Sequence, residues 1–179
     1  MRKKNIALIA HDNRKSELME WAEYNAEVLS KHNLYATGTT GRMLKNIVYN
    51  VQEYSEITEC KYSHMVFPFK DNVTCLLSGP LGGDAEAGAM IAEGKIDVLI
   101  FFCDNLIQQG HQNDIYGLTR LASLYNIPFA TNRTTADMIL TSPLFDNDDY
   151  ERILPSAIEK YRNRFNSVSD DKTEGIDEQ

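Results

Sequence analysis

The sequence has no long hydrophobic run. Its longest uninterrupted apolar stretch, Val98 to Cys103, is six residues, whereas a membrane-spanning helix needs ~18 or more. A shorter run, Ile6 to Ala10, follows three basic residues, but a signal-peptide core takes about 7–15 apolar residues. We therefore expect a cytoplasmic protein with no membrane segment.

Basic residues are also scarce relative to acidic ones. The chain has 18 Lys and Arg against 26 Asp and Glu, a net charge of −8. Proteins that bind nucleic acids present a basic surface, so we expect no nucleic-acid partner. Acidic residues crowd the last residues of the chain, where apolar residues almost disappear. We predict that residues 167–179 form a disordered acidic tail.

Cysteine is scarce as well. Cys60, Cys75 and Cys103 are widely spaced, and no CxxC or Cys/His pair has the spacing of a zinc site. We expect buried, reduced thiols and no metal centre.

The remaining pattern alternates strands with helices, which is typical of a mostly parallel sheet covered on both faces. We predict an α/β fold: a single three-layer αβα domain with a mostly parallel five-stranded sheet over residues 1–166. Residues 49–72 fit neither period and are predicted to be an insertion, a hairpin or another excursion. The predicted strands are Asn5–Ala10, Asn33–Thr37, Val73–Leu77, Val98–Cys103 and Pro128–Thr131. The predicted helices are Lys15–Lys31, Arg42–Val48, Ala85–Glu93, Ile115–Tyr125, Thr134–Leu140 and Pro155–Phe165.

Polar residues follow four of the five predicted strands. Parallel strands bring these segments to one edge of the sheet, where ligands bind in such folds. The residues are His11, Asp12 and Lys15 after the first strand, Thr37, Gly38, Thr39 and Thr40 after the second, Ser78, Gly79 and Asp84 after the third, and Asp104, His111 and Asp114 after the fourth.

These residue types suit a phosphate site with acid–base chemistry beside it. Glycines let the backbone approach a phosphate, hydroxyls donate hydrogen bonds, and Lys15 adds a positive charge. A carboxylate whose pKa is raised by burial can remove a proton. Each residue also has an ordinary interpretation: the threonines and Asp84 as helix caps, and His111 as a structural histidine.

The order and length of these motifs resemble the methylglyoxal synthase family. The resemblance covers most of the chain from Asn5 to Leu144. The matching stretches are Ile6–Asp12 with Lys15, Leu34–Gly41, Leu77–Asp84, Ala89–Phe102, Arg120–Ala122, Asn126–Pro128, Ala130–Asn132 and Thr135–Asp137.

The resemblance implies conversion of dihydroxyacetone phosphate to methylglyoxal and inorganic phosphate, without a metal or organic cofactor. Asp84 would be the base and His111 would polarise the carbonyl, while Asp12, Asp104 and Asp114 complete the catalytic group. The implied phosphate- and substrate-binding residues are His11, Lys15, Thr37, Gly38, Thr39, Thr40, Ser78, Gly79 and Arg164. The family forms a homohexamer, in which Arg164, or alternatively Arg162, would reach a neighbouring site; phosphate would act as product and inhibitor.

Three departures from the family pattern concern the surroundings of the site. Asn105 and Gly110 stand where the family has prolines, which loosens the loop that carries His111. The stretch between Gly41 and Ser78 is longer than is usual in the family. Two alternatives stay open: a non-catalytic phosphate- or effector-binding module of the same fold, and a related enzyme domain of nucleotide metabolism. A binding module would need Lys15 and the threonines but neither Asp84 nor His111.

Overall fold

A five-stranded sheet forms the centre of the molecule. The computed structural model describes residues 2–55, 60–106 and 112–164. The strand order is β5–β2–β1–β6–β7, and all pairings within this sheet are parallel. The predicted α/β class with a parallel five-stranded sheet is therefore confirmed. The strands are β1 (Asn5–Ala10), β2 (Asn33–Ala36), β5 (Val73–Cys75), β6 (Val98–Phe102) and β7 (Phe129–Ala130).

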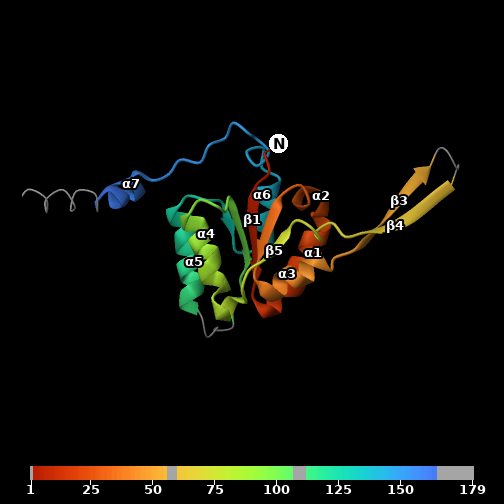
Figure 1. The fold of residues 1–179 in the computed structure, drawn as a ribbon, viewed down its shortest axis with the longest axis horizontal. Helices are drawn as coiled ribbons and strands as arrows, with labels where there is room; N and C mark the ends of the chain where they lie inside the picture. Colours follow the sequence, from red (N-terminus) through yellow and green to blue (C-terminus); the bar gives the residue numbers. More distant parts are fainter. Residues whose placement is uncertain (1, 56–59, 107–111, 165–179) are drawn as a thin grey trace, which may run out of the picture.

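Helices cover both faces of this sheet and make the predicted three layers (Figure 1). On β1, Ile6 and Leu8 belong to one buried core while Ala7 and Ile9 belong to the other, because successive strand residues face opposite sides. The first core packs under α1 (Lys15–Tyr24), α2 (Ala26–Leu29), α3 (Gly38–Lys45) and α6 (Arg133–Leu140), and the second under α4 (Gly83–Ala92) and α5 (Gln112–Leu124).

Two helices differ most from their predicted extents, while the other four begin and end within three residues of the predicted bounds. The helix predicted over Lys15–Lys31 is interrupted at Asn25, which has φ −97° and ψ 17°, and its side-chain amide donates to Trp21 O at 2.9 Å. Such local bonding by Asn competes with the helix. The predicted start at Arg42 is also wrong, since α3 begins at Gly38, and the amide of Gly41 already donates to Thr37 O at 2.9 Å. The glycine-containing motif is therefore the first turn of a helix rather than a loop.

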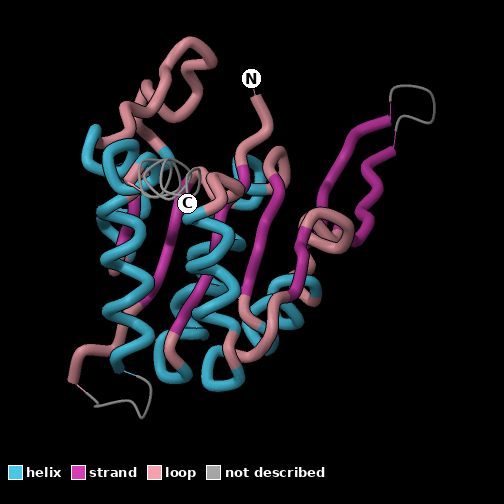
Figure 2. The backbone as a smooth tube through the Cα atoms, turned by 60° about the vertical axis from the view of Figure 1, so that its left-hand side comes forward, coloured by secondary structure: helices cyan, strands magenta, loops and turns pink. Residues whose placement is uncertain are grey.

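Two segments stand apart from the layers. β3 (Tyr49–Ser55) and β4 (Cys60–Val66) form an antiparallel hairpin that projects beyond the edge of the parallel sheet (Figures 1 and 2). At the other side, α7 (Ser156–Asn163) ends a long connection after α6 (Figure 1). Residues 167–179, predicted as a tail, lie outside the described residues. Within the described ranges, no helix combines the length and apolar character required to cross a membrane.

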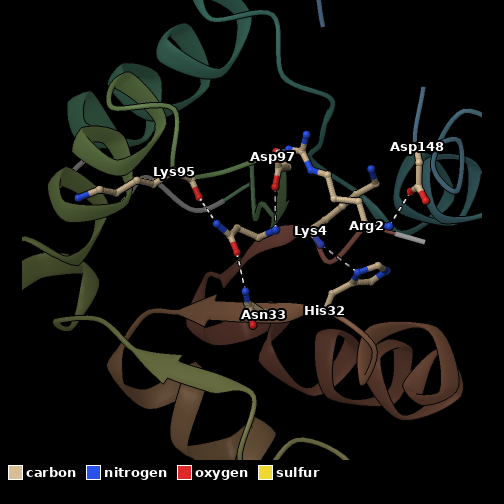
Figure 3. A network of polar contacts seen from close by, with 8 residues as sticks. Arg2, Lys4, His32, Asn33, Lys95, Asp97 and Asp148 are labelled. Carbon is tan, nitrogen blue, oxygen red and sulfur yellow. Dashed lines mark hydrogen bonds and ion pairs between the residues drawn. The ribbon is translucent and has the colours of Figure 1, made fainter. Parts of the chain in front are cut away.

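A polar network joins the amino ends of the central strands (Figure 3). The backbone amide of Asn5 donates to Asp97 Oδ2 at 2.9 Å, and Asn33 Nδ2 donates to Asn5 Oδ1 at 2.8 Å. Arg2 pairs with Asp97 at 3.0 Å. These bonds fix the register at one edge of the sheet, which leaves the opposite, carboxyl-end edge for the polar residues predicted from the sequence.

Candidate functional site

A cavity of about 540 Å³ opens at the carboxyl ends of the central strands. It collects eight of the residues that the sequence singled out, from three strand ends that are far apart in the chain. Hydrophobic residues of β1 and β6 form part of its wall. The lining is Ile9, Ala10, His11, Asp12, Lys15, Thr37, Thr39, Ser78, Gly79, Pro80, Asp84 and Phe101.

His11 directly follows β1 and is buried in the cavity wall. Its Nδ1 accepts a hydrogen bond of 2.7 Å from the backbone amide of Asp104, and its ring contacts that of Phe101 edge to face at 5.0 Å. Because Nδ1 is the acceptor, the neutral ring carries its proton on Nε2. His11 is therefore held in one tautomer by the end of the neighbouring strand β6.

Lys15 supplies a cation at the start of α1. Its side chain is 17% exposed, and its ammonium lies 2.5 Å from Asp12 Oδ1. The Asp12 side chain is 91% exposed, so the ion pair is mostly solvated and weak. An anionic ligand entering the cavity can therefore replace Asp12 as the partner of Lys15 at little cost.

Only some residues of the motif Thr37–Thr40 line the cavity. Thr37 and Thr39 line it, whereas Thr40 is fully buried with its Oγ1 3.5 Å from that of Thr37. Gly38 is not in the lining either: a Cβ there would lie 3.3 Å from the backbone nitrogen of Ser78. Gly38 and Thr40 thus allow the second and third strand ends to approach, and α3 begins with its amino end toward the cavity, which favours an anion.

Asp84 is the most buried carboxylate of the site, at 4% exposed. It lies in the first turn of α4, next to Gly79: a Cβ on Gly79 would be 3.3 Å from Asp84 Oδ2. The turn that brings them together runs through Gly82, whose φ of 104° lies in the left-handed region that favours glycine. A buried carboxylate beside a lysine and two threonines can serve as a base next to a bound anion.

The remaining predicted residues are not in the cavity lining. Asp104 lies at its edge, where its amide holds His11 and its Oδ2 accepts from Asn13 Nδ2 at 3.2 Å. His111 lies outside the described residues, and of Asp114 only the backbone, in α5, is described. Arg164 is not in the lining either; it follows α7, which stands apart from the sheet (Figure 1). No group of three or more potential metal-binding side chains is found among the described residues.

Two residues at or next to the site, Glu86 and Phe101, were not predicted from the sequence. Glu86 Oε2 accepts from the backbone amide of Leu77 at 2.9 Å, just before Ser78. Its position two residues after Asp84 is the only signal the sequence offers. Phe101 lies within an apolar run that predicts burial and nothing more.

The prediction that the cysteines are buried is wrong for Cys75, which is exposed at the end of β5, an edge strand of the sheet. Cys103 is half-buried, and burial raises the pKa of its thiol to about 11. It is therefore not a nucleophile at neutral pH. The side chain of Cys60 lies outside the described residues.

Comparisons with known proteins identify the relatives of this chain. The MGS-like domain family matches residues 17–131. A methylglyoxal synthase of Maridesulfovibrio salexigens is 49% identical over 145 residues, which is 81% of this chain and 87% of that protein. One of Proteus mirabilis is 45% identical over 87% of this chain and 92% of the relative. The crystal structure of methylglyoxal synthase from Elizabethkingia anophelis NUHP1 is similar with a TM-score of 0.67 and 37% identity, covering 86% of each chain.

Proposed function

This chain belongs to the methylglyoxal synthase family, and we propose that it converts dihydroxyacetone phosphate to methylglyoxal and inorganic phosphate as a carbon–oxygen lyase. The observation that carries the proposal is the burial of Asp84 in the same cavity as Lys15. A base and an anion site within one small cavity suit removal of a proton from a phosphorylated substrate.

The phosphate of the substrate binds between Lys15 and the two strand ends that carry Thr37 and Ser78. Lys15 supplies charge, and the hydroxyls of Thr37, Thr39 and Ser78 donate hydrogen bonds. The backbone at Gly79 completes the cradle, because a glycine lets the phosphate approach closely. The 540 Å³ of the cavity is ample for a three-carbon phosphate.

Asp84 begins the reaction by taking a proton from C3, the hydroxymethyl carbon. The electrons of that C–H bond form an enediolate, whose charge is stabilised by a donor at the carbonyl oxygen. His11 lines the same cavity, and the family resemblance assigns this role to His111. The enediolate then expels phosphate as its C–O bond breaks, and the resulting enol tautomerises to methylglyoxal.

The further parts of the proposal concern assembly, control and location. A homohexamer would bring Arg164 of one subunit to the cavity of another, which fits its absence from the cavity lining of its own chain. Inorganic phosphate would compete with substrate for Lys15 and the threonines. A substrate of central carbon metabolism is consistent with a cytoplasmic enzyme. No partner other than this substrate and further copies of the chain is needed for the reaction.

The direct test incubates purified protein with dihydroxyacetone phosphate in metal-chelated buffer and measures methylglyoxal and phosphate together. Equimolar release of both, faster than the spontaneous reaction, is the expected result. If the protein gives no product but is stabilised against heat by phosphate, the non-catalytic binding module of the same fold becomes the better interpretation.

The role of Asp84 has its own test. Asp84→Asn keeps the shape of the side chain and removes the base, so turnover should fall by about a hundredfold or more. Phosphate binding, measured by calorimetry, should persist in this variant because Lys15 and the hydroxyls are intact. Turnover close to that of the unmodified protein would exclude Asp84 as the base.

A further inference from the structure

The backbone at Leu77 links the two strand ends that form the proposed phosphate cradle. Its carbonyl oxygen accepts from the amide of Gly38, the first residue of α3, at 3.0 Å. Its amide donates to Glu86 Oε2 on α4 at 2.9 Å. The peptide units around Leu77 are therefore anchored to both helices whose amino ends adjoin the cavity.

Packing of the Leu77 side chain does not hold this position, because that side chain is 58% exposed. The backbone, in contrast, has little room to move toward α4: a Cβ on Gly83 would lie only 2.1 Å from Leu77 O. Ser78 O accepts from the amides of Leu81 and Gly83, each at 2.9 Å. These bonds shape the turn after Ser78. Among these contacts, only the one from Glu86 fixes the backbone amide of Leu77.

From these contacts we propose that Glu86 is a positioning residue for phosphate binding, acting through Leu77 on the orientation of Ser78 and Gly79. The inference rests on the proposed function of the cavity. Glu86 does not line the cavity and touches no reacting atom. Its carboxylate holds the Leu76–Leu77 peptide unit, and the Gly38 amide holds the next unit, so that the Ser78 hydroxyl and the Gly79 backbone meet the ligand in one fixed arrangement.

A merely structural role would have a different signature. Glu86 lies in the first turn of α4, where any carboxylate stabilises a helix end. If that were its whole effect, its loss would lower the fraction of folded enzyme and reduce apparent kcat, with KM unchanged. Loss of a positioned cradle weakens the binding of substrate and transition state alike, which raises KM and leaves kcat nearly constant.

The test compares Glu86→Ala with Glu86→Gln, whose amide oxygen can still accept from Leu77. Glu93→Ala is the matched control, since Glu93 is an exposed carboxylate that follows the other end of α4 and pairs with Lys95. For each protein we would measure the Kd for inorganic phosphate by calorimetry, and kcat and KM for dihydroxyacetone phosphate.

Glu86→Ala should raise the phosphate Kd and the KM together by about 3- to 10-fold, the scale of one hydrogen bond, with kcat within about twofold. Glu86→Gln and Glu93→Ala should stay within about twofold of the unmodified protein. The exchange rate of the Leu77 amide proton, measured by NMR, should increase in Glu86→Ala and remain slow in Glu86→Gln.

Three outcomes separate the possible failures. In the first, the unmodified protein and Glu86→Ala bind phosphate with equal affinity, although the Leu77 amide exchanges fast in Glu86→Ala alone. This result would overturn the positioning role and leave the proposed function intact. Unmodified protein that binds no phosphate would overturn both. A lower kcat at unchanged KM in Glu86→Ala would assign Glu86 to helix stability and likewise reject the proposal.

Discussion

Adding one methyl group at Gly79 should slow catalysis without weakening the fold. A Cβ at this position would lie 3.3 Å from Asp84 Oδ2, 3.4 Å from Oδ1 and 3.6 Å from Cγ. Ordinary contacts to a Cβ begin near 3.4 Å, so the carboxylate must move by a few tenths of an ångström. Since Asp84 is 4% exposed, the open space beside it is the cavity that it lines, and a shift there changes its position relative to the substrate.

The size of the effect follows from this displacement. A misplacement of about 1 Å can cost a hundredfold in rate, so a shift of a few tenths of an ångström should lower kcat by about 3- to 10-fold. Gly79 is not among the glycines with positive φ, and alanine at a compatible position stabilises a protein by about 0.4–1 kcal/mol through the unfolded state. The melting temperature of Gly79→Ala should therefore hold or rise slightly.

The assay measures kcat, KM and the phosphate Kd for Gly79→Ala beside a control, Gly117→Ala. A Cβ at Gly117, in α5, would meet nothing within 4 Å, so that control tests the general effect of replacing glycine. The phosphate Kd should also rise in Gly79→Ala, because the added Cβ hinders the close approach of phosphate to this backbone, while kcat reports the displacement of Asp84. If kcat of Gly79→Ala equals that of the unmodified enzyme, the position of Asp84 does not limit the reaction and the reasoning fails.

Three further predictions concern stability. Gly83→Ala should destabilise the fold by more than about 2 kcal/mol, because its Cβ would lie 2.1 Å from Leu77 O, a backbone atom; a urea midpoint equal to that of the unmodified protein would contradict this. Trp21→Phe should cost about 1–3 kcal/mol in urea unfolding followed by circular dichroism, because the Trp21 Nε1–H that donates to Asp137 Oδ1 at 2.7 Å is lost. Burial, and after it the charge of Lys4, lowers the pKa of His32 from its usual 6.5. Below that pH the native state therefore binds fewer protons than the unfolded state. The free energy of unfolding should consequently fall as the pH drops from about 7 toward 5. His32→Gln should flatten this dependence in urea titrations, and an unchanged slope would remove His32 as its source.

The five parallel strands were predictable from the sequence because the central part of each is a short apolar run between polar residues. β1 and β6 are buried on both faces, and such strands need no alternation to be recognised. The break at Asn25 and the early start of α3 were missed because both depend on local backbone bonds. The spacing of apolar residues does not report those bonds.

The sequence predicted which residues belong to the candidate site better than it predicted how they are arranged. Residues at four strand ends were expected to converge, and the cavity lining contains residues from three of them, including His11, Lys15 and Asp84. Nothing in the sequence separates Thr39, which faces the cavity, from Thr40, which is buried beneath it. That distinction depends on how α3 is rotated against β5, and Glu86 was missed because a backbone amide is its partner.

The strand order also bears on how the chain acquires its site during synthesis. β1 pairs early with β2, but its other neighbour is β6, whose residues lie more than ninety positions later. At about 5–20 residues per second, a ribosome leaves one edge of β1 uncovered for several seconds. The amide of Asp104 that holds His11 arrives just after β6. A nascent chain can therefore bind its ligand only after β6 has paired with β1. Ligand binding by nascent chains of increasing length would show when this pairing occurs.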